Sequence, residues 1–354
     1  MSVTEDEIKA FSFNIWSYKQ GEMVSMMIHL GDRLGIYKAL VGAGPMTADQ
    51  LADKTGYHPR WLQEWLLNQA AARILESEDG TTFSLPEAGA AVLADEENSL
   101  HFAAGAFAAP THPDLIDRLA EAFRSGIGLS YEELGPSGAH RTERMLGPWA
   151  RLALVPRIIP ALDGIEDKLK NGAVACDVGC GGGLAIAALA AAFPASEFHG
   201  YDPSTHAIAN ARRKKEEQGL DNLHLHQGSG VDLPEGPTYD FVITFDCMHD
   251  MTRPDQTIAA IRRSLKPDGT WLIKDIKSFG DFRKNRKNPM LAMMYGFSVS
   301  ACMSSALSEE GGMGLGTLGF HPQVAREMTR AGGFSGFVQH DFDDPTNFYY
   351  EVRI

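Results

Sequence analysis

The chain has 354 residues, of which 44% are hydrophobic and 22% are charged, a composition typical of a folded protein of two domains or of one domain with a large addition. Its formal net charge of −14 opposes association with nucleic acid and with anionic membrane surfaces. No apolar run approaches a membrane span, the acidic N-terminus is unlike a signal peptide, and the four cysteines form no paired motif, so we expect a cytoplasmic protein without disulfides or a metal site.

The first hundred residues are predicted to be mainly helical. Residues 1–45 carry an apolar helical face, Thr47–Gln50 fits a capping box, and Pro59 suits the first position of a helix. A hairpin is expected within 74–85, around the turn Asp79-Gly80. The apolar face of the first segment comprises Leu30, Leu34, Tyr37 and Val41.

These elements follow the order of a winged helix, which is helix, short helix, longer helix and hairpin. The predicted domain therefore resembles the N-terminal domain fused to small-molecule O-methyltransferases. A winged helix can bind DNA, but the candidate recognition helix, about residues 59–73, has only Arg60 and Arg73 as cations, with Glu64 opposing them. We therefore expect residues 1–100 to build a homodimer or cap the substrate, without a nucleic-acid partner.

Residues 101–165 are expected to form a helical linker interrupted by glycines at 126–129 and 135–138. Such a segment can act as a lid over a neighbouring site or simply join two domains, and its sequence favours neither.

The most informative stretch is Val174–Gly183, which has the sequence Val-Ala-Cys-Asp-Val-Gly-Cys-Gly-Gly-Gly. An apolar strand ends at Asp177, a glycine turn follows, and helix formers begin at Leu184. A second strand ends at Asp202, where an acid can accept hydrogen bonds from a ribose diol. The dinucleotide fingerprint Gly-x-Gly-x-x-Gly/Ala does not fit the glycine spacing in either register.

The spacing Asp-x-Gly-x-Gly-x-Gly resembles motif I of the class I S-adenosylmethionine (SAM) methyltransferases. This resemblance implies that Asp177 contacts the methionine end of SAM and that Asp202 contacts its ribose. The residues expected to bind the cofactor are Asp177, Gly179, Cys180, Gly181, Gly183, Asp202, Gly228, Ser229, Gly230, Asp246 and Cys247. Ser229 stands where many members of the family carry an acid, so Asp232 is an alternative contact for the adenine.

Strands and helices alternate from about residue 171 to the end. The alternation predicts an α/β fold with a Rossmann-like seven-stranded sheet over residues 166–354, whose last two strands form an antiparallel pair. Residues 278–319 interrupt the alternation as an insertion rich in methionine, which could line a substrate cavity or pack against the N-terminal domain. Strands are expected at 173–178, 197–201, 223–227, 239–245, 271–276, 336–342 and 348–352, and helices at 184–192, 205–218, 255–265 and 322–331.

The segment after the fourth strand ends Met248-His249-Asp250-Met251 and resembles the pattern of plant-type O-methyltransferases, in which the histidine is the general base. The resemblance implies that His249 is the catalytic residue, although Met251 replaces the tryptophan of that pattern. Histidine titrates near neutrality and suits this task, and Asp250 could orient it. The alternative is a structural histidine that bonds the backbone at a strand end.

The sequence therefore predicts a SAM-dependent methyltransferase that acts on an oxygen of a small, largely apolar metabolite. Two alternatives stay open: a SAM-sensing winged-helix regulator of transcription, and a SAM-binding enzyme that transfers no methyl group.

Overall fold

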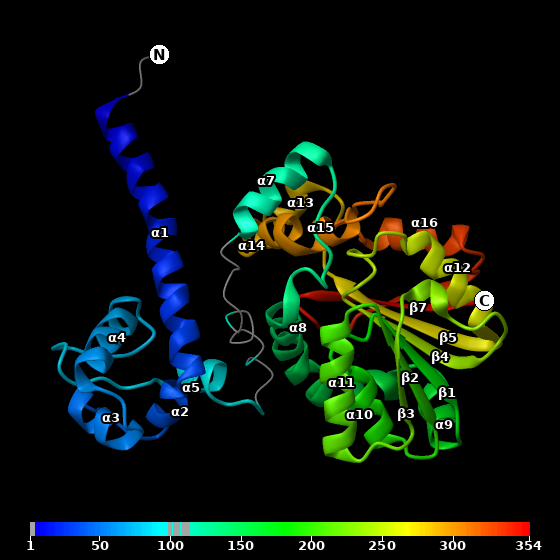
Figure 1. The fold of residues 1–354 in the computed structure, drawn as a ribbon, viewed down its shortest axis with the longest axis horizontal. Coiled ribbons are helices and arrows are strands. Elements are labelled where there is room, and N and C mark those ends of the chain that lie inside the picture. The colour runs from blue at the N-terminus through cyan, green and yellow to red at the C-terminus, as the bar shows by residue number, and fades with distance from the viewer. Residues whose placement is uncertain (1–3, 98–100, 102–106, 108–113) are drawn as a thin grey trace. The chain divides into compact units, whose positions relative to one another are not determined.

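The computed structural model describes residues 4–97, 101, 107 and 114–354, and for residues 137–142 and 145 it describes the backbone alone. The chain forms two compact units (Figure 1), one made of Met1–Pro110 with Arg144–Pro148 and the other of Thr111–Glu143 with Trp149–Ile354. Residues 102–106 and 108–113 of the expected 101–165 linker lie outside the described residues. None of the described helices has the length and apolarity that a bilayer crossing requires.

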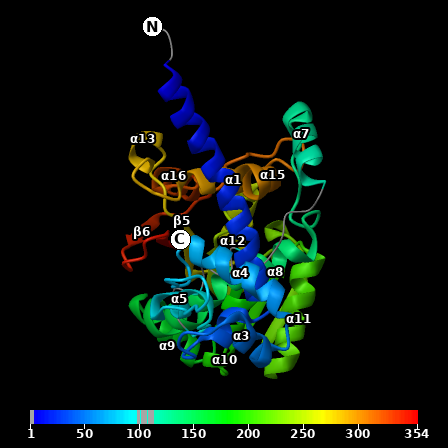
Figure 2. The ribbon, with the colours of Figure 1, turned by 90° about the vertical axis from the view of Figure 1, so that its left-hand side faces the viewer.

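The N-terminal unit is built from short helices and one long one. Its helices are α1 (Glu5–Arg33), α2 (Ile36–Leu40), α3 (Ala48–Thr55), α4 (Pro59–Ala71) and α5 (Glu87–Leu93). The expected capping box opens α3, because the Thr47 hydroxyl accepts from the Gln50 amide and the Gln50 side chain accepts from the Thr47 amide. Within this unit, the N-terminal half of α1 extends well beyond the other helices (Figure 2).

Two local expectations for this unit need correction. Gly35, with φ of 68°, separates α1 from α2, so the apolar face expected across residues 30–41 is interrupted and Val41 is exposed. The expected hairpin is reduced to single antiparallel bridges, Met46 with Phe83 and Glu76 with Ser84. The helical face is broken by the left-handed turn at Gly35, and the expected two-residue turn at Asp79-Gly80 is part of a longer loop, residues 77–83, between Glu76 and its partner Ser84.

Trp65 of α4 lies at the centre of the packing in this unit. Its indole nitrogen donates to the Met27 carbonyl at 2.9 Å, and its ring meets the Tyr37 ring edge-on at 5.2 Å. Gly31 of α1 is buried beside these two rings. A side chain at Gly31 would overlap the Trp65 ring and approach Tyr37 Cε2 to 2.9 Å, so glycine lets α1 approach α4 closely.

The second unit contains the predicted seven-stranded sheet, in the order β3-β2-β1-β4-β5-β7-β6. The first five strands run parallel, and β7 pairs antiparallel with both β5 and β6. The strands are β1 (Val174–Val178), β2 (Glu197–Asp202), β3 (Leu223–Gln227), β4 (Tyr239–Phe245), β5 (Leu265–Ile276), β6 (Gly336–His340) and β7 (Asn347–Arg353). The expected fifth strand, 271–276, is the second half of β5.

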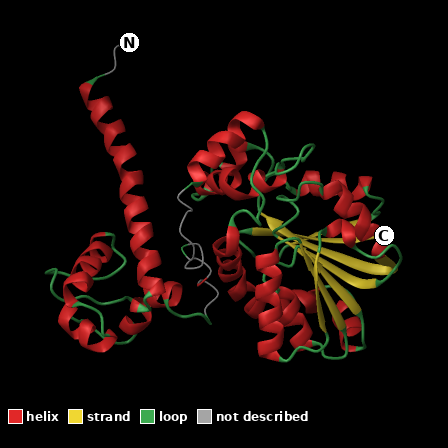
Figure 3. Cartoon of the chain, viewed as in Figure 1, coloured by secondary structure: helices red, strands yellow, loops and turns green. Residues whose placement is uncertain are grey.

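Helices cover both faces of the sheet (Figure 3). One buried core lies between the sheet and α9, α10 and α11, and the other lies between the sheet and α12 and α16. The helical elements of this unit are α7 (Leu115–Ser125), α8 (Gly135–Trp149, shared with the first unit), η2 (Ala150–Ile158), η3 (Ile159–Ala161), α9 (Ile165–Lys170), α10 (Leu184–Ala192), α11 (Thr205–Gln218), η4 (Gly230–Asp232), α12 (Pro254–Ser264), α13 (Phe282–Asn285), α14 (Leu291–Phe297), η5 (Ser298–Cys302), α15 (Met303–Ala306) and α16 (Pro322–Ala331).

The insertion between β5 and α16 folds into α13, α14, η5 and α15 and is joined to a segment from before the sheet. The Gly128 amide donates to the Leu307 carbonyl at 2.9 Å, and the Leu129 amide donates to the Ser304 hydroxyl at 2.7 Å. A side chain at Gly128 would overlap the Ser304 backbone. The linker residues just before Tyr131 are therefore fixed against the insertion.

Two glycines of α1 test the packing of the N-terminal unit. Gly31→Ala should lower the free energy of unfolding by about 1–3 kcal/mol, because the new methyl group overpacks against Trp65 and Tyr37. Gly21→Ala is the matched control: nothing lies within 4 Å of a Cβ there, so the higher helix propensity of alanine should stabilise by up to about 1 kcal/mol. Urea unfolding followed by tryptophan fluorescence measures both, and equal effects would contradict the close contact.

Candidate functional site

The glycine turn after β1 adopts a backbone that side chains tolerate poorly. Gly179, Gly181 and Gly183 have φ of 77°, 53° and 73°. A side chain at Gly179 would also meet Cys247 Sγ at 2.8 Å. Glycine is therefore required here by both conformation and space, and the turn exposes backbone in place of side chains.

Hydrogen bonds fix this turn against the end of β2. The Gly179 and Cys180 amides both donate to the Tyr201 carbonyl, at 2.8 and 3.0 Å, and the Gly181 amide donates to Asp202 Oδ2 at 2.8 Å. Asp202 Oδ1 accepts from the Ser204 amide at 2.9 Å, at the start of α11. The two predicted strand ends are thus joined through Asp202.

Asp177 is 2% exposed, and its Oδ1 has no hydrogen-bond partner among the described residues. Burial, followed by the charge of Asp202, raises the pKa of Asp177 well above its usual range, and burial also raises the pKa of Asp202. A buried carboxylate oxygen without a partner is costly, and a cationic or hydrogen-bonding ligand beside the turn would satisfy it.

The loop after β3 holds the predicted Gly228, Ser229 and Gly230. The Ser229 amide and hydroxyl both donate to Asp232 Oδ2, at 2.7 and 3.0 Å. Gly230 packs against Thr257 of α12 so closely that a side chain there would overlap it. Asp232 therefore shapes this loop, and the Ser229 amide is already engaged.

Asp246 follows β4 with φ of 53°. Its carboxylate pairs with the buried Lys274 and accepts from the Asn347 side chain. Burial raises the pKa of Asp246, and the Lys274 charge opposes the rise. The Asp246 carboxylate is thus already paired with side chains of β5 and β7. The neighbouring Cys247 thiol donates to the Val178 carbonyl at 3.2 Å, next to the glycine turn.

His249 is 2% exposed and forms a close pair with Asp275 at the end of β5. Its Nδ1 lies 2.7 Å from Asp275 Oδ1, which also accepts from the Ile276 amide at 2.7 Å. Burial lowers the pKa of His249, but the Asp275 carboxylate and the Cys302 side chain together outweigh burial and raise this pKa well above its ordinary value. The carboxylate that orients His249 is therefore Asp275; its neighbour Asp250 does not accept this bond.

Asp250 and Cys302 lie close to the imidazole, and the Cys302 side chain bonds to it. One ligand atom from each of His249, Asp250 and Cys302 can be chosen so that all three lie within 4.8 Å of one another. Tyr131 Oη lies 3.8 Å from Cys302 Sγ and interacts with Asp250, and burial raises the pKa of Asp250 to about 7. Perturbed acids beside a buried histidine are typical of a functional site.

Sequence reasoning missed four residues of this region: Tyr131, Glu132, Asp275 and Cys302. Glu132 accepts from the Ser204 hydroxyl and the Thr205 amide, both at 2.9 Å, and so caps α11 next to Asp202. Asp275 could have been found, since it ends a parallel strand beside β4. The others come from segments whose approach to the sheet has no signal in the sequence.

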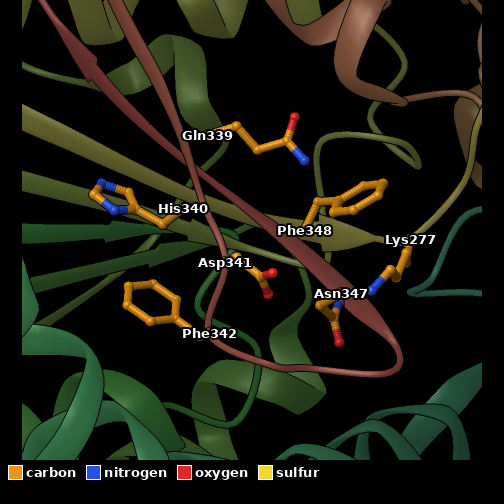
Figure 4. A pocket seen from close by; sticks show the side chains of 7 residues that line it. All are labelled: Lys277, Gln339, His340, Asp341, Phe342, Asn347 and Phe348. Carbon is orange, nitrogen blue, oxygen red and sulfur yellow. The ribbon is translucent and has the colours of Figure 1, made fainter.

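A hollow elsewhere on this unit contains none of the predicted site residues. It lies along β6 and β7 and is lined by Lys277, Gln339, His340, Asp341, Phe342, Asn347 and Phe348 (Figure 4). The candidate site is therefore marked by its glycine turn and buried acids rather than by this hollow.

Comparisons with known proteins agree with this geometry. Residues 169–312 match the family described as a methyltransferase domain, and residues 22–95 match the Rv2258c-like winged HTH domain. No curated protein matches the chain.

Solved structures share the fold over nearly the whole chain. Mitomycin 7-O-methyltransferase MmcR is 19% identical with a TM-score of 0.68, over 99% of this chain and 100% of that one. Human N-acetylserotonin methyltransferase, solved with SAM, is 18% identical with a TM-score of 0.66, over 100% and 99%. An O-methyltransferase family protein from Burkholderia thailandensis is 15% identical with a TM-score of 0.67, over 99% and 98%. The predicted sheet and the winged-helix N-terminal domain are confirmed.

Proposed function

We propose that the chain, which is a SAM-dependent methyltransferase, transfers its methyl group to a hydroxyl of a small, largely apolar metabolite. One observation carries the proposal: the glycine turn, Asp177, Asp202 and the His249–Asp275 pair belong to the carboxyl ends of neighbouring parallel strands. The O-methyltransferases that share the fold support oxygen as the acceptor atom.

The residues around the turn fit SAM in charge and shape. Asp177 Oδ1, buried without a partner, suits the ammonium group of the methionine end, and Asp202 suits the ribose diol. The turn at Gly179, Gly181 and Gly183 presents no side chain to the ligand. We assign the adenine to the loop of Gly228 and Ser229, with Asp232 holding that loop in place.

His249 acts in this proposal as the general base. When bound, SAM would supply a methyl carbon on a sulfonium: the acceptor oxygen would attack this carbon in line, and the sulfur would leave with both electrons of the broken bond as S-adenosylhomocysteine. Asp275 holds Nδ1 of His249, so Nε2 is the nitrogen that takes the acceptor's proton. Because Asp275 stabilises the imidazolium, His249 can hold that proton after transfer.

The insertion supports an apolar acceptor. Its surface carries exposed, adaptable side chains: Phe282, Met290, Met293 and Tyr295. All four cysteines are free thiols, which suits the cytoplasmic location that we propose.

The transcriptional alternative gains little support from the N-terminal unit. Arg60, at the start of α4, is paired with Glu64 at 2.6 Å, while the neighbouring Trp61 is 80% exposed. A paired cation beside an exposed indole is a poor phosphate contact.

Release of S-adenosylhomocysteine in a turnover assay would separate methyl transfer from binding alone.

Asp202→Ala tests the ribose assignment. Loss of a charged hydrogen-bonding partner should weaken SAM binding by about 1.5–3 kcal/mol, measured by calorimetry. Asp268→Ala is the control, because Asp268 is an exposed acid paired with Lys168 outside the candidate site. Unchanged affinity in Asp202→Ala would refute the assignment.

His249→Ala tests the base. Turnover should fall about 10²–10⁴-fold with SAM affinity nearly intact, because the base faces the acceptor. Because its neighbours raise the pKa of His249 above that of an ordinary histidine, the wild-type rate should rise with pH over a limb that lies above the ordinary histidine range, and this limb should vanish in the variant. The rates are measured on a panel of phenols and hydroxylated aromatics.

The matched control for this variant is His340→Ala, which removes another histidine paired with a carboxylate, Glu351 at 2.8 Å, outside the site. It should keep both the rate and the pH limb. A His249→Ala enzyme that works at the wild-type rate across pH would leave His249 a structural role.

We also propose that the N-terminal unit builds a homodimer through α1. This helix exposes a series of large apolar side chains: Ile8, Phe11, Phe13, Ile15, Trp16, Tyr18, Met23, Met26 and Leu30. The double variant Phe13→Glu/Trp16→Glu should shift light-scattering mass from dimer to monomer. Ser17→Glu/Gln20→Glu adds the same charge at exposed polar positions of α1 and should stay dimeric. A monomeric wild-type chain would refute the dimer.

A further inference from the structure

Three side chains of different ligand chemistry converge at the carboxyl end of β4. His249 and Asp250 follow that strand, and Cys302 arrives from η5 in the insertion. An imidazole nitrogen, a carboxylate oxygen and a thiol sulfur lie within 4.8 Å of one another. Zinc ligands bonded at 2.0–2.3 Å in a tetrahedron are roughly 3.3–3.8 Å apart. Side-chain movements of about 1 Å would therefore bring the three ligand atoms to the separations of a tetrahedral zinc site.

The orientation of His249 is that of a metal ligand. Nδ1 is bonded to Asp275 Oδ1 at 2.7 Å, and Asp275 is itself held by the Ile276 amide. This fixes the ring so that, once His249 is deprotonated, Nε2 carries the lone pair that a cation can bind. Histidines that bind metals typically have their other ring nitrogen held by a carboxylate in this way.

The ligand set selects the class of cation. One sulfur, one nitrogen and one oxygen suit a borderline-soft ion such as Zn²⁺, whereas Mg²⁺ and Ca²⁺ prefer oxygen ligands alone. The thiolate and the carboxylate together balance a charge of +2. Three protein ligands leave the fourth position of a tetrahedral site open. Tyr131, whose hydroxyl lies 3.8 Å from Cys302 Sγ, borders the three ligands.

We propose that His249, Asp250 and Cys302 bind a Zn²⁺-class cation, and that this cation reversibly inhibits methyl transfer. The inhibitory part rests on the proposed function of His249 as base. A lone pair on Nε2 that is donated to a metal cannot accept a proton from the acceptor. Coordination releases to solvent the thiol proton of Cys302 and any proton that His249 or Asp250 carries, so no oxidant or reductant is involved.

The site itself is tested by cobalt titration of the full chain after treatment with EDTA. One equivalent of Co²⁺ should give the intense visible bands of a tetrahedral site and a thiolate-to-cobalt charge-transfer band, and Zn²⁺ should abolish both. Cys302→Ser should lose the charge-transfer band, whereas Cys176→Ser, which removes a thiol buried in β1, should keep it. Asp275→Asn should weaken Zn²⁺ binding about 10–100-fold by releasing the imidazole.

Inhibition is measured separately. Zn²⁺ should lower the methyl-transfer rate of the wild type in step with site occupancy, and EDTA should restore it. Absence of the charge-transfer band in the wild type, or its survival in Cys302→Ser, overturns the site and leaves the proposed function untouched. A Cys302-dependent band with full turnover at saturating Zn²⁺ overturns the inhibition, and with it the role of Nε2 as base.

Discussion

The parallel pairing of β1 with β2 and β4 is the constraint on which the candidate site depends. It places the carboxyl ends of these strands at one edge of the sheet, with β5 next to β4. The strand order reverses at β1, so the connections leave on opposite sides and leave room above that edge. Asp177, Asp202 and His249 come from separate strands, yet each follows or ends one at this edge.

The same edge concentrates buried charge, which a protein tolerates only with compensation. Asp246 is compensated by Lys274 and Asn347, and His249 by Asp275. Asp177 is not, since its Oδ1 has no partner among the described residues. Asp275 Oδ2 is also without a partner, but the other oxygen of Asp275 holds His249, whereas no hydrogen bond or ion pair compensates Asp177 among the described residues.

The surroundings of the site come from segments remote in sequence. Glu132 caps α11 beside Asp202, Cys302 of the insertion lies close to the imidazole, and Tyr131 of the linker contacts Cys302. Both segments are joined by the hydrogen bonds of Gly128 and Leu129 to α15 and its end. The residues that surround His249 are therefore held by the packing of the linker on the insertion.

The sequence by itself determined the sheet, α10, α11 and α16, and the turn from Asp177 to Gly183, because hydrophobic periodicity, caps and glycine conformation act over a few residues. It did not determine that Asp275 would orient His249 or that Asp232 would fold back on Ser229. It also gave no sign of Tyr131, Glu132 and Cys302, and it overstated the hairpin near Asp79. These outcomes depend on which distant segments pack together, and side-chain pairing across such contacts is decided by space and burial in the folded chain.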